Sequence, residues 1–471
     1  MNVLILINAA PGYKEYYYQL GEELRLKGCN IYYAVDSMRS RYLTPLPDLD
    51  DSEKTHYFDK YFKENYLRDE FESFSDEYWG DVFYSDFDRF LTHNYNLDKT
   101  SEYWICLKNC LSGFFEEIFN NYNIDCVLYE NISNSFAYMA YKSCVKHDKL
   151  YVGLMGSRLP GHFEIQNSII DKELDKLSLL KKEPISGEEI EWFTAYKNKI
   201  NSIEPDYMKN NGLDNVSLSR LLKFEKIYQL YKLAIIGFKY NSYYDFQFGS
   251  PWKAIFRGLK VNFFRYYRTK LSNKYYLDNE VVKEKSSKER FYVYPIHYHP
   301  ESSTSVLAPE YTNEYTNIIN IANNLPFGTY LYVKDHKSAK GVQDLSFYKK
   351  ISVLPAVRLV NYDYNIKELI GRSQGVITVN STAGYEALLL GKPVYLLGRV
   401  FYENFANVKK LTNFKSLRTE LLSFDVTHDD VMYDFLSYYR YCYKGIIDIK
   451  GMRGVENIAN QVFSHIKKMV G

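Results

Sequence analysis

The chain has 471 residues, 46% of them hydrophobic, and a formal net charge of +1. This length predicts two or three domains, and the near-neutral charge argues against a nucleic-acid partner. Six scattered cysteines, without a second pair of metal ligands, are typical of reduced thiols in a cytoplasmic protein. The apolar start NVLILIN lacks a basic region and indicates a strand rather than a signal peptide. No run of about eighteen apolar residues predicts a membrane span.

The N-terminal third of the chain alternates between strand and helix patterns. After the first strand, the segment YKEYYYQLGEELRLKG has the spacing of an amphipathic helix. Runs that predict strands lie at residues 2–8, 29–36, 124–132 and 150–156. We therefore predict an N-terminal Rossmann-like domain over residues 1–165, with a polar, Tyr-rich and Phe-rich helical insertion at about 40–120.

Residues 166–285 lose the strand pattern and predict a mainly helical insertion or linker, after which a cleaner series begins. Its strands are predicted at residues 290–298, 329–336, 357–361, 375–380 and 393–398, with a helical pattern after each of the first four. Such alternation predicts a parallel sheet covered on both faces. Residues 286–471 are thus expected to form a C-terminal Rossmann-like domain with helices at its end. The predicted fold class is α/β, with two Rossmann-like domains that face a cleft.

Polar residues gather where three of the C-terminal strands end, and the carboxyl ends of parallel strands lie at one edge of a sheet. They are His297, His299 and Glu301 after the first strand, Lys334 and His336 after the second, and Ser381, Thr382, Gly384 and Glu386 after the fourth. This convergence predicts a ligand site at that edge.

The helix predicted to begin near Thr382 offers an anion site. Its first N–H groups have no partner within the helix, and its dipole favours negative charge. Ser381 and Thr382 add hydroxyl donors, Gly384 permits close approach, and together these features suit one phosphate. Glu386 does not have the spacing of a capping box, so we expect it to bind a ribose. The alternative is a capped helix in which Glu386 is solvated or salt-bridged.

Lys334 and His336 alternate along a strand end and are expected to face one side, where they would hold a base carbonyl and a phosphate. The alternative is a surface lysine and a structural histidine. We expect His297 and Glu301 to contact the donor or the acceptor and His299 to be a reserve for acid–base catalysis. A capped loop is the alternative for His299 and Glu301.

A transferase must deprotonate the hydroxyl of its acceptor, which requires a carboxylate or a histidine within hydrogen-bonding reach. Glu130 ends a predicted strand of the N-terminal domain and is the first choice, with Glu164 and His299 in reserve. The alternative for Glu130 is an ion pair with a nearby lysine. Arg158 is suited to clamp a carboxylate with two hydrogen bonds, and a salt bridge within its loop is the alternative.

Three stretches resemble the bacterial capsule polysaccharide biosynthesis family: YPIHYHPESST, LYVKDH and VNSTAGYEALLLGKPVYLLG. The likeness covers about residues 286–405 and is weaker around DCVLYENISNSFAY and GSRLPGHFEI. The family includes β-Kdo transferases and related enzymes that use CMP-activated nonulosonic acids. The resemblance implies a GT-B-type glycosyltransferase that binds its nucleotide in the C-terminal domain and its acceptor in the N-terminal domain.

The resemblance also implies roles for individual residues. They are Lys334 at the cytosine region, His336, Ser381 and Thr382 at the phosphate, and Glu386 at the ribose. The chain departs from the family at two places: Lys337 stands where a proline is expected, and Met155 precedes Gly156 where many capsule Kdo transferases have an acidic residue.

The implied reaction moves a keto-acid sugar of the Kdo, sialic or pseudaminic acid type from a CMP donor to a lipid-linked or oligosaccharide acceptor of a surface polysaccharide. A CMP donor carries one phosphate, so we expect neither a metal nor another cofactor, although Asp-x-Asp pairs occur at residues 48–50 and 86–88. The alternatives are a GT-B transferase that uses a UDP- or GDP-hexose and a non-catalytic scaffold of a capsule assembly complex.

A basic and aromatic stretch at residues 251–271 offers a membrane contact. Its apolar residues Trp252, Ile255, Phe256, Leu259 and Phe263 would form one stripe on a helix, flanked by Lys253, Arg257, Lys260, Arg265, Arg268 and Lys270. This composition is typical of an interfacial helix attracted to anionic lipid, so we expect a cytoplasmic protein that visits the inner face of the membrane. The alternative is an amphipathic helix whose aromatic side chains pack on the core.

Overall fold

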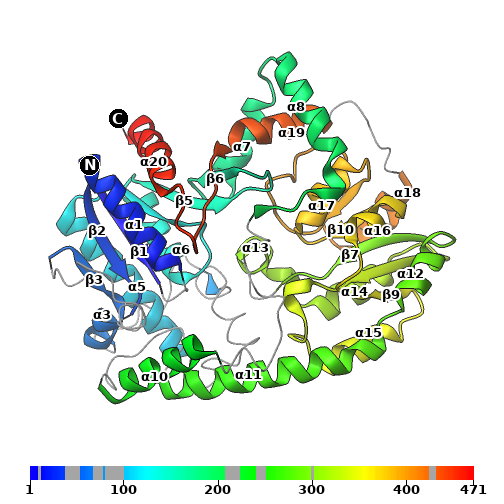
Figure 1. The fold of residues 1–471 in the computed structure, drawn as a ribbon, viewed down its shortest axis with the longest axis horizontal. Helices are drawn as coiled ribbons and strands as arrows, with labels where there is room; N and C mark the ends of the chain where they lie inside the picture. The colour runs from blue at the N-terminus through cyan, green and yellow to red at the C-terminus, as the bar shows by residue number, and fades with distance from the viewer. Residues whose placement is uncertain are drawn as a thin grey trace. The chain divides into compact units, whose positions relative to one another are not determined.

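The chain folds into two compact units. The computed structural model describes residues 1–8, 12–37, 53–66, 78–79, 100–206, 223–239, 251–298, 302–423 and 431–470. Unit 1 comprises residues 1–169, 218–261 and 442–471, and unit 2 comprises residues 170–217 and 262–441. Each unit contains one β-sheet (Figure 1).

The sheet of unit 1 has seven strands in the order β13-β6-β5-β4-β1-β2-β3. They are β1 (Asn2–Ile7), β2 (Asn30–Val35), β3 (Thr55–Tyr57), β4 (Cys126–Glu130), β5 (Leu150–Gly156), β6 (His162–Gln166) and β13 (Tyr443–Lys444). Strands β1 to β5 pair in parallel, whereas β6 and β13 pair antiparallel at one edge. The order 3-2-1-4-5 of the parallel strands is that of a Rossmann-like sheet.

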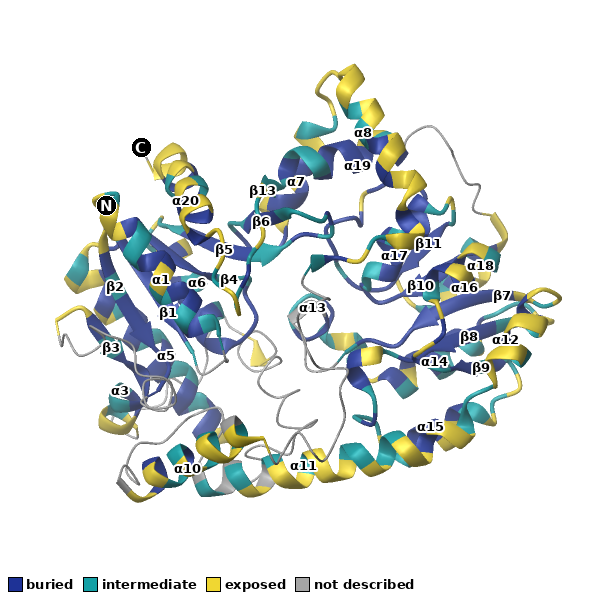
Figure 2. Cartoon of the chain, in the orientation of Figure 1, coloured by how far each residue is buried: buried dark blue, intermediate teal, exposed yellow. Residues whose placement is uncertain are grey.

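The strands of unit 1 form because their apolar runs are buried on both faces of the sheet, as the dark blue colour of β1 and β4 shows (Figure 2). The helices assigned to this unit are α1 (Tyr13–Leu26), α3 (Phe58–Asn65), α5 (Ser101–Tyr122), α6 (Ser135–Lys146), α10 (Phe224–Lys239) and α20 (Val455–Val470). Helix α11 (Pro251–Ser272) contributes residues to both units.

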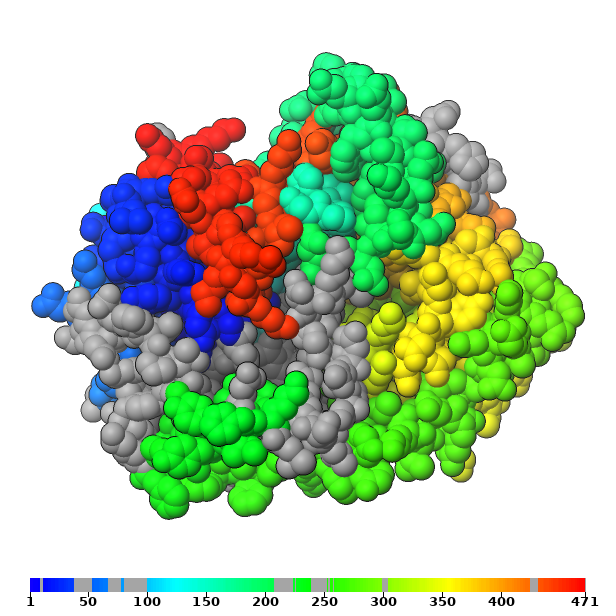
Figure 3. All heavy atoms as spheres, in the orientation of Figure 1, coloured from blue at the N-terminus to red at the C-terminus, as the bar shows by residue number. Residues whose placement is uncertain are grey.

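The C-terminal helix α20 belongs to unit 1, where it packs against α1 (Figure 3). Val455, Ile458, Val462 and Ile466 recur every three or four residues and are buried in the core of this unit. The observed division therefore differs from the predicted domain over 286–471, because the amphipathic face of α20 completes the first core instead of the second.

Unit 2 contains a six-stranded sheet in the order β12-β11-β10-β7-β8-β9, with all neighbouring strands parallel. Its strands are β7 (Arg290–Pro295), β8 (Thr329–Lys334), β9 (Val357–Val360), β10 (Val376–Thr378), β11 (Val394–Leu396) and β12 (Val408–Lys410). Counted from β7 along the chain, this is the order 3-2-1-4-5-6 of a complete Rossmann sheet. The predicted α/β class with two Rossmann-like sheets is confirmed.

Helices accompany the strands of unit 2 and precede its sheet in the chain. They are α7 (Asp171–Leu180), α8 (Gly187–Asn198), α12 (Asn279–Ser286), α13 (Ser302–Ser305), α14 (Glu314–Ala322), α15 (Leu345–Ser352), α16 (Ile366–Arg372), α17 (Thr382–Leu389), α18 (Leu417–Ser423) and α19 (Val431–Tyr441). The region 166–285, predicted as one helical insertion, is divided: α7 and α8 lie in unit 2, and α10 lies in unit 1.

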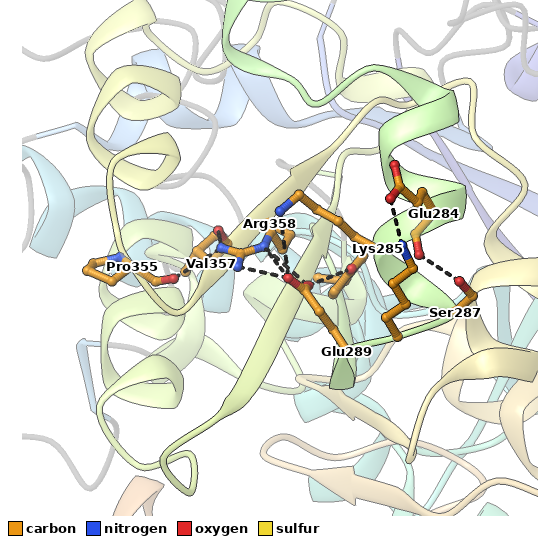
Figure 4. Close-up of polar contacts among 9 residues, drawn as sticks. Glu284, Lys285, Ser287, Glu289, Pro355, Val357 and Arg358 are labelled. Atoms are coloured by element: carbon orange, nitrogen blue, oxygen red, sulfur yellow. Dashed lines mark hydrogen bonds and ion pairs between the residues drawn. The ribbon is translucent and has the colours of Figure 1, made fainter.

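An ion pair secures the amino-terminal end of this second sheet (Figure 4). The Arg358 guanidinium of β9 donates to both carboxylate oxygens of Glu289, which immediately precedes β7, with N···O distances of 3.0–3.3 Å. The Tyr332 hydroxyl of β8 donates to the same carboxylate at 2.8 Å. The pair therefore links the residue before β7 to the second residue of β9, with Tyr332 from the middle of β8 between them, and Glu289 lies at the opposite end of β7 from the predicted ligand site.

Two chain-wide features bear on the sequence predictions. All six cysteines are free, and only Cys442 among them is not buried. Within the described residues, none of the helices has both the length and the apolar character needed to cross a membrane.

Candidate functional site

The order of strands in unit 2 defines where a ligand would bind. From β7 the chain proceeds to β8 and β9 on one side, and it then returns to β10 and β11 on the other side. In sheets of this order, ligands bind beyond the carboxyl ends of the two strands at the reversal, here β7 and β10. The site is therefore sought among the side chains that follow β7, β10 and their neighbour β8.

His297 follows β7 and links its loop to the end of β10. Its Nδ1 lies 3.0 Å from a carboxylate oxygen of Glu314, which can only accept, so the Nδ1 proton is donated there. The other ring nitrogen, Nε2, lies 3.2 Å from the Thr378 hydroxyl and accepts from the backbone N–H of Asn380 at 3.4 Å. The buried ring thus holds both loops in place. Its predicted contact with the donor or acceptor stays a prediction.

Ser381 caps helix α17 at the end of β10. Its hydroxyl accepts from the backbone N–H of Ala383 at 3.2 Å, and its own N–H donates to the Thr378 hydroxyl at 3.0 Å. Gly384 lies against Tyr402, whose hydroxyl would be 2.4 Å from a Cβ at this position. Packing against Tyr402 thus accounts for the glycine without a ligand. The predicted phosphate contacts of Ser381, Thr382 and Gly384 remain untested.

Glu386 forms the salt bridge that the sequence left open as an alternative. Its carboxylate lies 3.3 Å from Lys367 Nζ of α16, and only 13% of its side chain is exposed. Lys367 also donates to the backbone carbonyls of Ile200 and Ile203. Burial raises the pKa of Glu386, and Lys367 opposes this rise. The sequence did not identify Lys367, because it lies within a helix and not at a strand end; the predicted role of Glu386 at a ribose stays a prediction.

The end of β8 contributes a buried lysine and a histidine. Lys334 Nζ donates to the backbone carbonyls of Asp335 and Tyr362, each at 2.8 Å, and burial lowers its pKa to about 8. His336 Nδ1 accepts from the Ser338 backbone N–H at 3.1 Å, so a neutral ring carries its proton on Nε2, the form that can donate to a phosphate. β8 pairs with β7 up to Lys334, which brings this strand end next to that of His297.

Arg399 is a cation at the same edge that the sequence analysis missed. It follows β11, and its backbone carbonyl accepts from the Asn380 side-chain amide at 3.4 Å. Its guanidinium lies 2.8 Å from Asp171 and 3.4 Å from Glu403, and 39% of its side chain is exposed. The strand-end rule that selected Ser381 would have selected Arg399 as well, because it comes directly after the run PVYLLG.

The predicted base, Glu130, ends β4 in unit 1. β4 pairs with β1, and the strand order of this unit reverses between these two strands. The Ser133 hydroxyl donates to the Glu130 carboxylate at 2.7 Å. Burial, and then the charge of Glu130, raise the pKa values of Tyr13, Tyr17 and Tyr151. Glu130 thus lies in a partly buried cluster of phenols at the unit 1 strand ends.

Arg158 and Glu164 form an ion pair in the same unit. The Nη1 atom of Arg158 lies 3.6 Å from the Glu164 carboxylate, which is almost fully buried. This is the salt bridge left open as the alternative for Arg158. Glu164 also lies directly opposite Met155 in the antiparallel pair of β5 and β6. A carboxylate therefore stands across the strand from the position where the family resemblance implied an acid.

Some predictions fall outside the described residues, namely those on His299, Glu301 and the Asp-x-Asp pairs at 48–50 and 86–88. Within the described part of the chain, no group of three or more His, Cys, Asp or Glu side chains could hold a metal ion.

The two sheets and their strand-end residues define a protein with two Rossmann-like α/β units, one of which has polar side chains at the strand ends around its switch point. Residues 222–422 match the family model described as capsule polysaccharide biosynthesis protein. This match over part of the chain confirms the resemblance seen in the sequence. The matched residues contain all of β7 to β12 and the polar residues that follow β7, β8 and β10.

Comparison with solved structures gives distant likenesses. The β-Kdo 2,4 transferase of KpsC from Thermosulfurimonas dismutans is 15% identical, with a TM-score of 0.40 over 76% of this chain and 94% of that one. The β-Kdo 2,7 transferase of the same KpsC is 11% identical, with a TM-score of 0.34 over 74% and 89%. S. aureus MnaA, solved with UDP, is 12% identical, with a TM-score of 0.28 over 99% and 97%. Scores this low assign no activity, and no curated protein matches the chain.

Proposed function

We propose that the protein is a glycosyltransferase that moves a keto-acid sugar from a CMP-activated donor to a surface polysaccharide acceptor. The donor sugar would be of the Kdo, sialic or pseudaminic acid type, and the acceptor a lipid-linked or oligosaccharide part of a capsule or lipopolysaccharide. The family match over residues 222–422 supports a role in the synthesis of a capsule polysaccharide. The side chains at the strand ends of unit 2 support a nucleotide as the donor group that this unit binds.

The observation that carries the proposal is the convergence of three strand ends at the switch point of unit 2. His297 joins the loop after β7 to the end of β10, and β8 ends beside β7 with Lys334. A capped helix N-terminus, an ammonium group and a histidine with its proton on Nε2 suit a single phosphate. In this proposal Glu386 binds the ribose, and Lys367 fixes the position of its carboxylate.

Unit 1 would supply the acceptor side of the reaction. The half-buried Glu130 accepts a hydrogen bond from Ser133 and would take the proton of the acceptor hydroxyl as a general base. Arg158 would bind the carboxylate of the donor sugar, which requires it to share its guanidinium with Glu164. Proton transfer and charge pairing by side chains would suffice, so the proposed reaction includes no metal and no cofactor.

One observation favours a second candidate, a transferase that uses a UDP- or GDP-sugar. Arg399 places an additional positive charge near the end of β10, next to Asn380, and a diphosphate needs more positive charge than a monophosphate. Asp171 and Glu403 already neutralise this guanidinium. We therefore keep CMP as the first candidate. A non-catalytic scaffold would have no use for the polar residues at these strand ends.

The experiment that tests the proposal is a transfer assay with a panel of donors. The purified protein is incubated with CMP-Kdo, CMP-sialic acid, UDP-glucose or GDP-mannose and a capsule oligosaccharide, and the released nucleotide is measured with and without EDTA. We expect CMP release that depends on the acceptor and persists in EDTA. Release from UDP- or GDP-sugars alone would establish the second candidate instead.

The proposal also includes peripheral contact with the inner face of the cytoplasmic membrane through residues 251–271. Of the predicted apolar stripe, Phe256, Leu259 and Phe263 are exposed, whereas Trp252 and Ile255 are partly buried. The three exposed side chains do not pack on the core.

A further inference from the structure

Helix α10 exposes an apolar stripe that the sequence analysis did not identify. Five of its large apolar side chains, at alternating spacings of four and three residues, lie on one face of the helix. They are Phe224, Tyr228, Tyr231, Ile235 and Phe238, with exposed fractions between 38% and 82%. Leu233 and Ile236 are buried instead. The helix thus has buried apolar side chains on one face and exposed apolar side chains on another (Figure 2).

Helix α11 lies beside α10 at the end of that stripe. The rings of Phe238 and Trp252 are in edge contact, with their centroids 4.8 Å apart. A Cβ on Gly237 would lie 2.6 Å from Trp252 Nε1, so the glycine permits this close approach. Beyond the contact, α11 exposes Phe256 and Leu259. We call these exposed apolar residues of α10, together with Phe256 and Leu259, the α10–α11 surface.

The segment that carries this surface is strongly basic. Residues 223–272 contain ten lysines and arginines and two acidic residues, which gives a formal charge of +8, whereas the whole chain carries only +1. Among these cations, Lys223 immediately precedes Phe224 and is exposed. Lys232 flanks the α10 stripe, and its Nζ lies 4.8 Å from the centre of the Tyr228 ring. On α11, Lys260 is exposed next to Leu259.

Two of the arginines predicted to bind lipid have another role. Arg265 donates to the backbone carbonyls of Ser338 and Lys340 at 2.6 and 2.7 Å. Arg268 donates to the Val342 carbonyl and pairs with Asp344. These contacts attach the second half of α11 to the loop that follows β8, so these arginines are used within unit 2. Among the described side chains, Lys223, Lys232 and Lys260 lie beside the α10–α11 surface and supply positive charge to a partner.

We propose that the α10–α11 surface is a docking site for an anionic lipid bilayer. Its aromatic side chains enter the headgroup region, and its lysines bind the lipid phosphates, as in interfacial helices of high positive charge. A second copy of the chain is a poorer partner, because two segments of charge +8 would face each other. This inference extends the membrane contact to a second helix and does not depend on the identity of the donor.

Vesicle flotation with the full chain tests this inference. We expect the wild type to bind vesicles of phosphatidylcholine with phosphatidylglycerol, not phosphatidylcholine alone, and to be released as salt rises. The apolar variant Phe224→Ser/Tyr231→Ser/Ile235→Ser should lose at least about tenfold of its binding at every salt concentration. The charge variant Lys223→Ser/Lys232→Ser/Lys260→Ser should lose a similar share of its binding, but at low salt only.

The matched control is Leu26→Ser/Phe327→Ser, which removes apolar side chains at least as exposed as those of the apolar variant from elsewhere in the chain and should bind like the wild type. Circular dichroism establishes that each variant is folded, and the charge variant, which alters only surface lysines, keeps the test valid if the apolar variant unfolds. Absent binding by the wild type, or equal binding by wild type and charge variant at low salt, overturns the proposal. A dimer in light scattering that the apolar variant abolishes, without vesicle binding, also overturns it in favour of self-association.

Discussion

The two units share a strand order but differ in the side chains at their strand ends. In unit 1 the switch point between β1 and β4 has a carboxylate, Glu130, among phenols whose pKa values it helps to raise. In unit 2 the equivalent edge has Lys334 after β8, and Lys367 and Arg399, which are paired with carboxylates. One edge therefore has an acid among phenols, and the other has three cations, two of which are in ion pairs.

This difference shows what the fold determines and what it leaves to the side chains. The strand order fixes the edge of each sheet at which a ligand binds, and the residues that follow the strands select its charge. An acid suits an acceptor hydroxyl that must lose a proton, whereas cations suit the phosphate of a nucleotide. Each prediction below tests this difference between the two units by changing single residues.

The largest effect is expected for Glu130→Gln. Sugar transfer should fall by about a hundredfold or more, because the amide cannot accept the proton, while the affinity for CMP stays unchanged. The matched control is Glu116→Gln, which alters a carboxylate of unit 1 that pairs with Lys146 at the surface. Initial rates measure sugar transfer, and calorimetric titration measures the affinity for CMP. Transfer by Glu130→Gln at the wild-type rate contradicts the assignment and directs the test to Glu164, which stands opposite Met155.

The next effect is on stability and comes from Lys367→Met. The substitution leaves Glu386 partly buried without its ion pair and should cost about 2–3 kcal/mol in the free energy of unfolding. The pKa of Glu386 is already raised in the folded state, so the folded state binds this proton more tightly than the unfolded state does. The contribution of Glu386 to stability therefore falls as pH rises above the ordinary pKa of a glutamate. Urea unfolding should therefore show a smaller loss at acidic pH than at neutral pH. A loss that does not depend on pH would show that the carboxylate is not responsible.

A third effect concerns pH and the nucleotide. Burial lowers the pKa of Lys334 to about 8, so the cation that would meet the nucleotide is lost at modestly alkaline pH. The affinity for CMP should fall by about tenfold per pH unit above that value, and Lys334→Met should abolish this dependence. In the absence of ligand, the unfolded state binds more protons between pH 8 and the ordinary lysine pKa, so the contribution of Lys334 makes stability rise with pH there. An identical pH profile in Lys334→Met would rule out this residue as the cause.

The smallest effect is a loss of stability on removal of one helix cap in each unit, which allows the two units to be compared. Ser381→Ala in unit 2 and Asn134→Ala in unit 1 each remove a side-chain acceptor from a helix N-terminus and should each cost about 1 kcal/mol in stability. Only Ser381→Ala should also weaken CMP binding. Thermal unfolding measures the first quantity and calorimetry the second. Equal losses of CMP affinity in both variants would show that α17 has no special part in binding the nucleotide.

The sequence predicted nine of the thirteen strands that the structure describes, because most of these nine are short apolar runs with a helical pattern after them. The run RFYVYP, for instance, is β7, and NVLILI is β1. The sequence missed the short strands β6, β12 and β13, and it was wrong at β3, which lies within the predicted helical insertion at about 40–120. It did not predict that α20 returns to unit 1. The amphipathic pattern of Val455, Ile458 and Val462 specifies a buried face but not the core that covers it.

At the candidate site, the sequence identified the residues that directly follow strands and missed those that act from elsewhere. Lys367 reaches Glu386 from the neighbouring helix α16, a contact that no local spacing encodes. Spacing likewise failed to show that His297 uses both ring nitrogens within the protein and that Gly384 packs against Tyr402. In these cases tertiary packing supplies a partner that a strand-end pattern cannot reveal.

The central claim is that the strand ends of unit 2 form a site for CMP, and direct titration of nucleotides tests it. CMP, CDP, UDP and GDP are titrated into the protein at matched concentrations by calorimetry, with thermal unfolding alongside. We predict that CMP binds most tightly and, at a hundredfold excess over its dissociation constant, stabilises the fold by about 2.7 kcal/mol. Equal or tighter binding of UDP or GDP, unaffected by Ser381→Ala, would contradict the account.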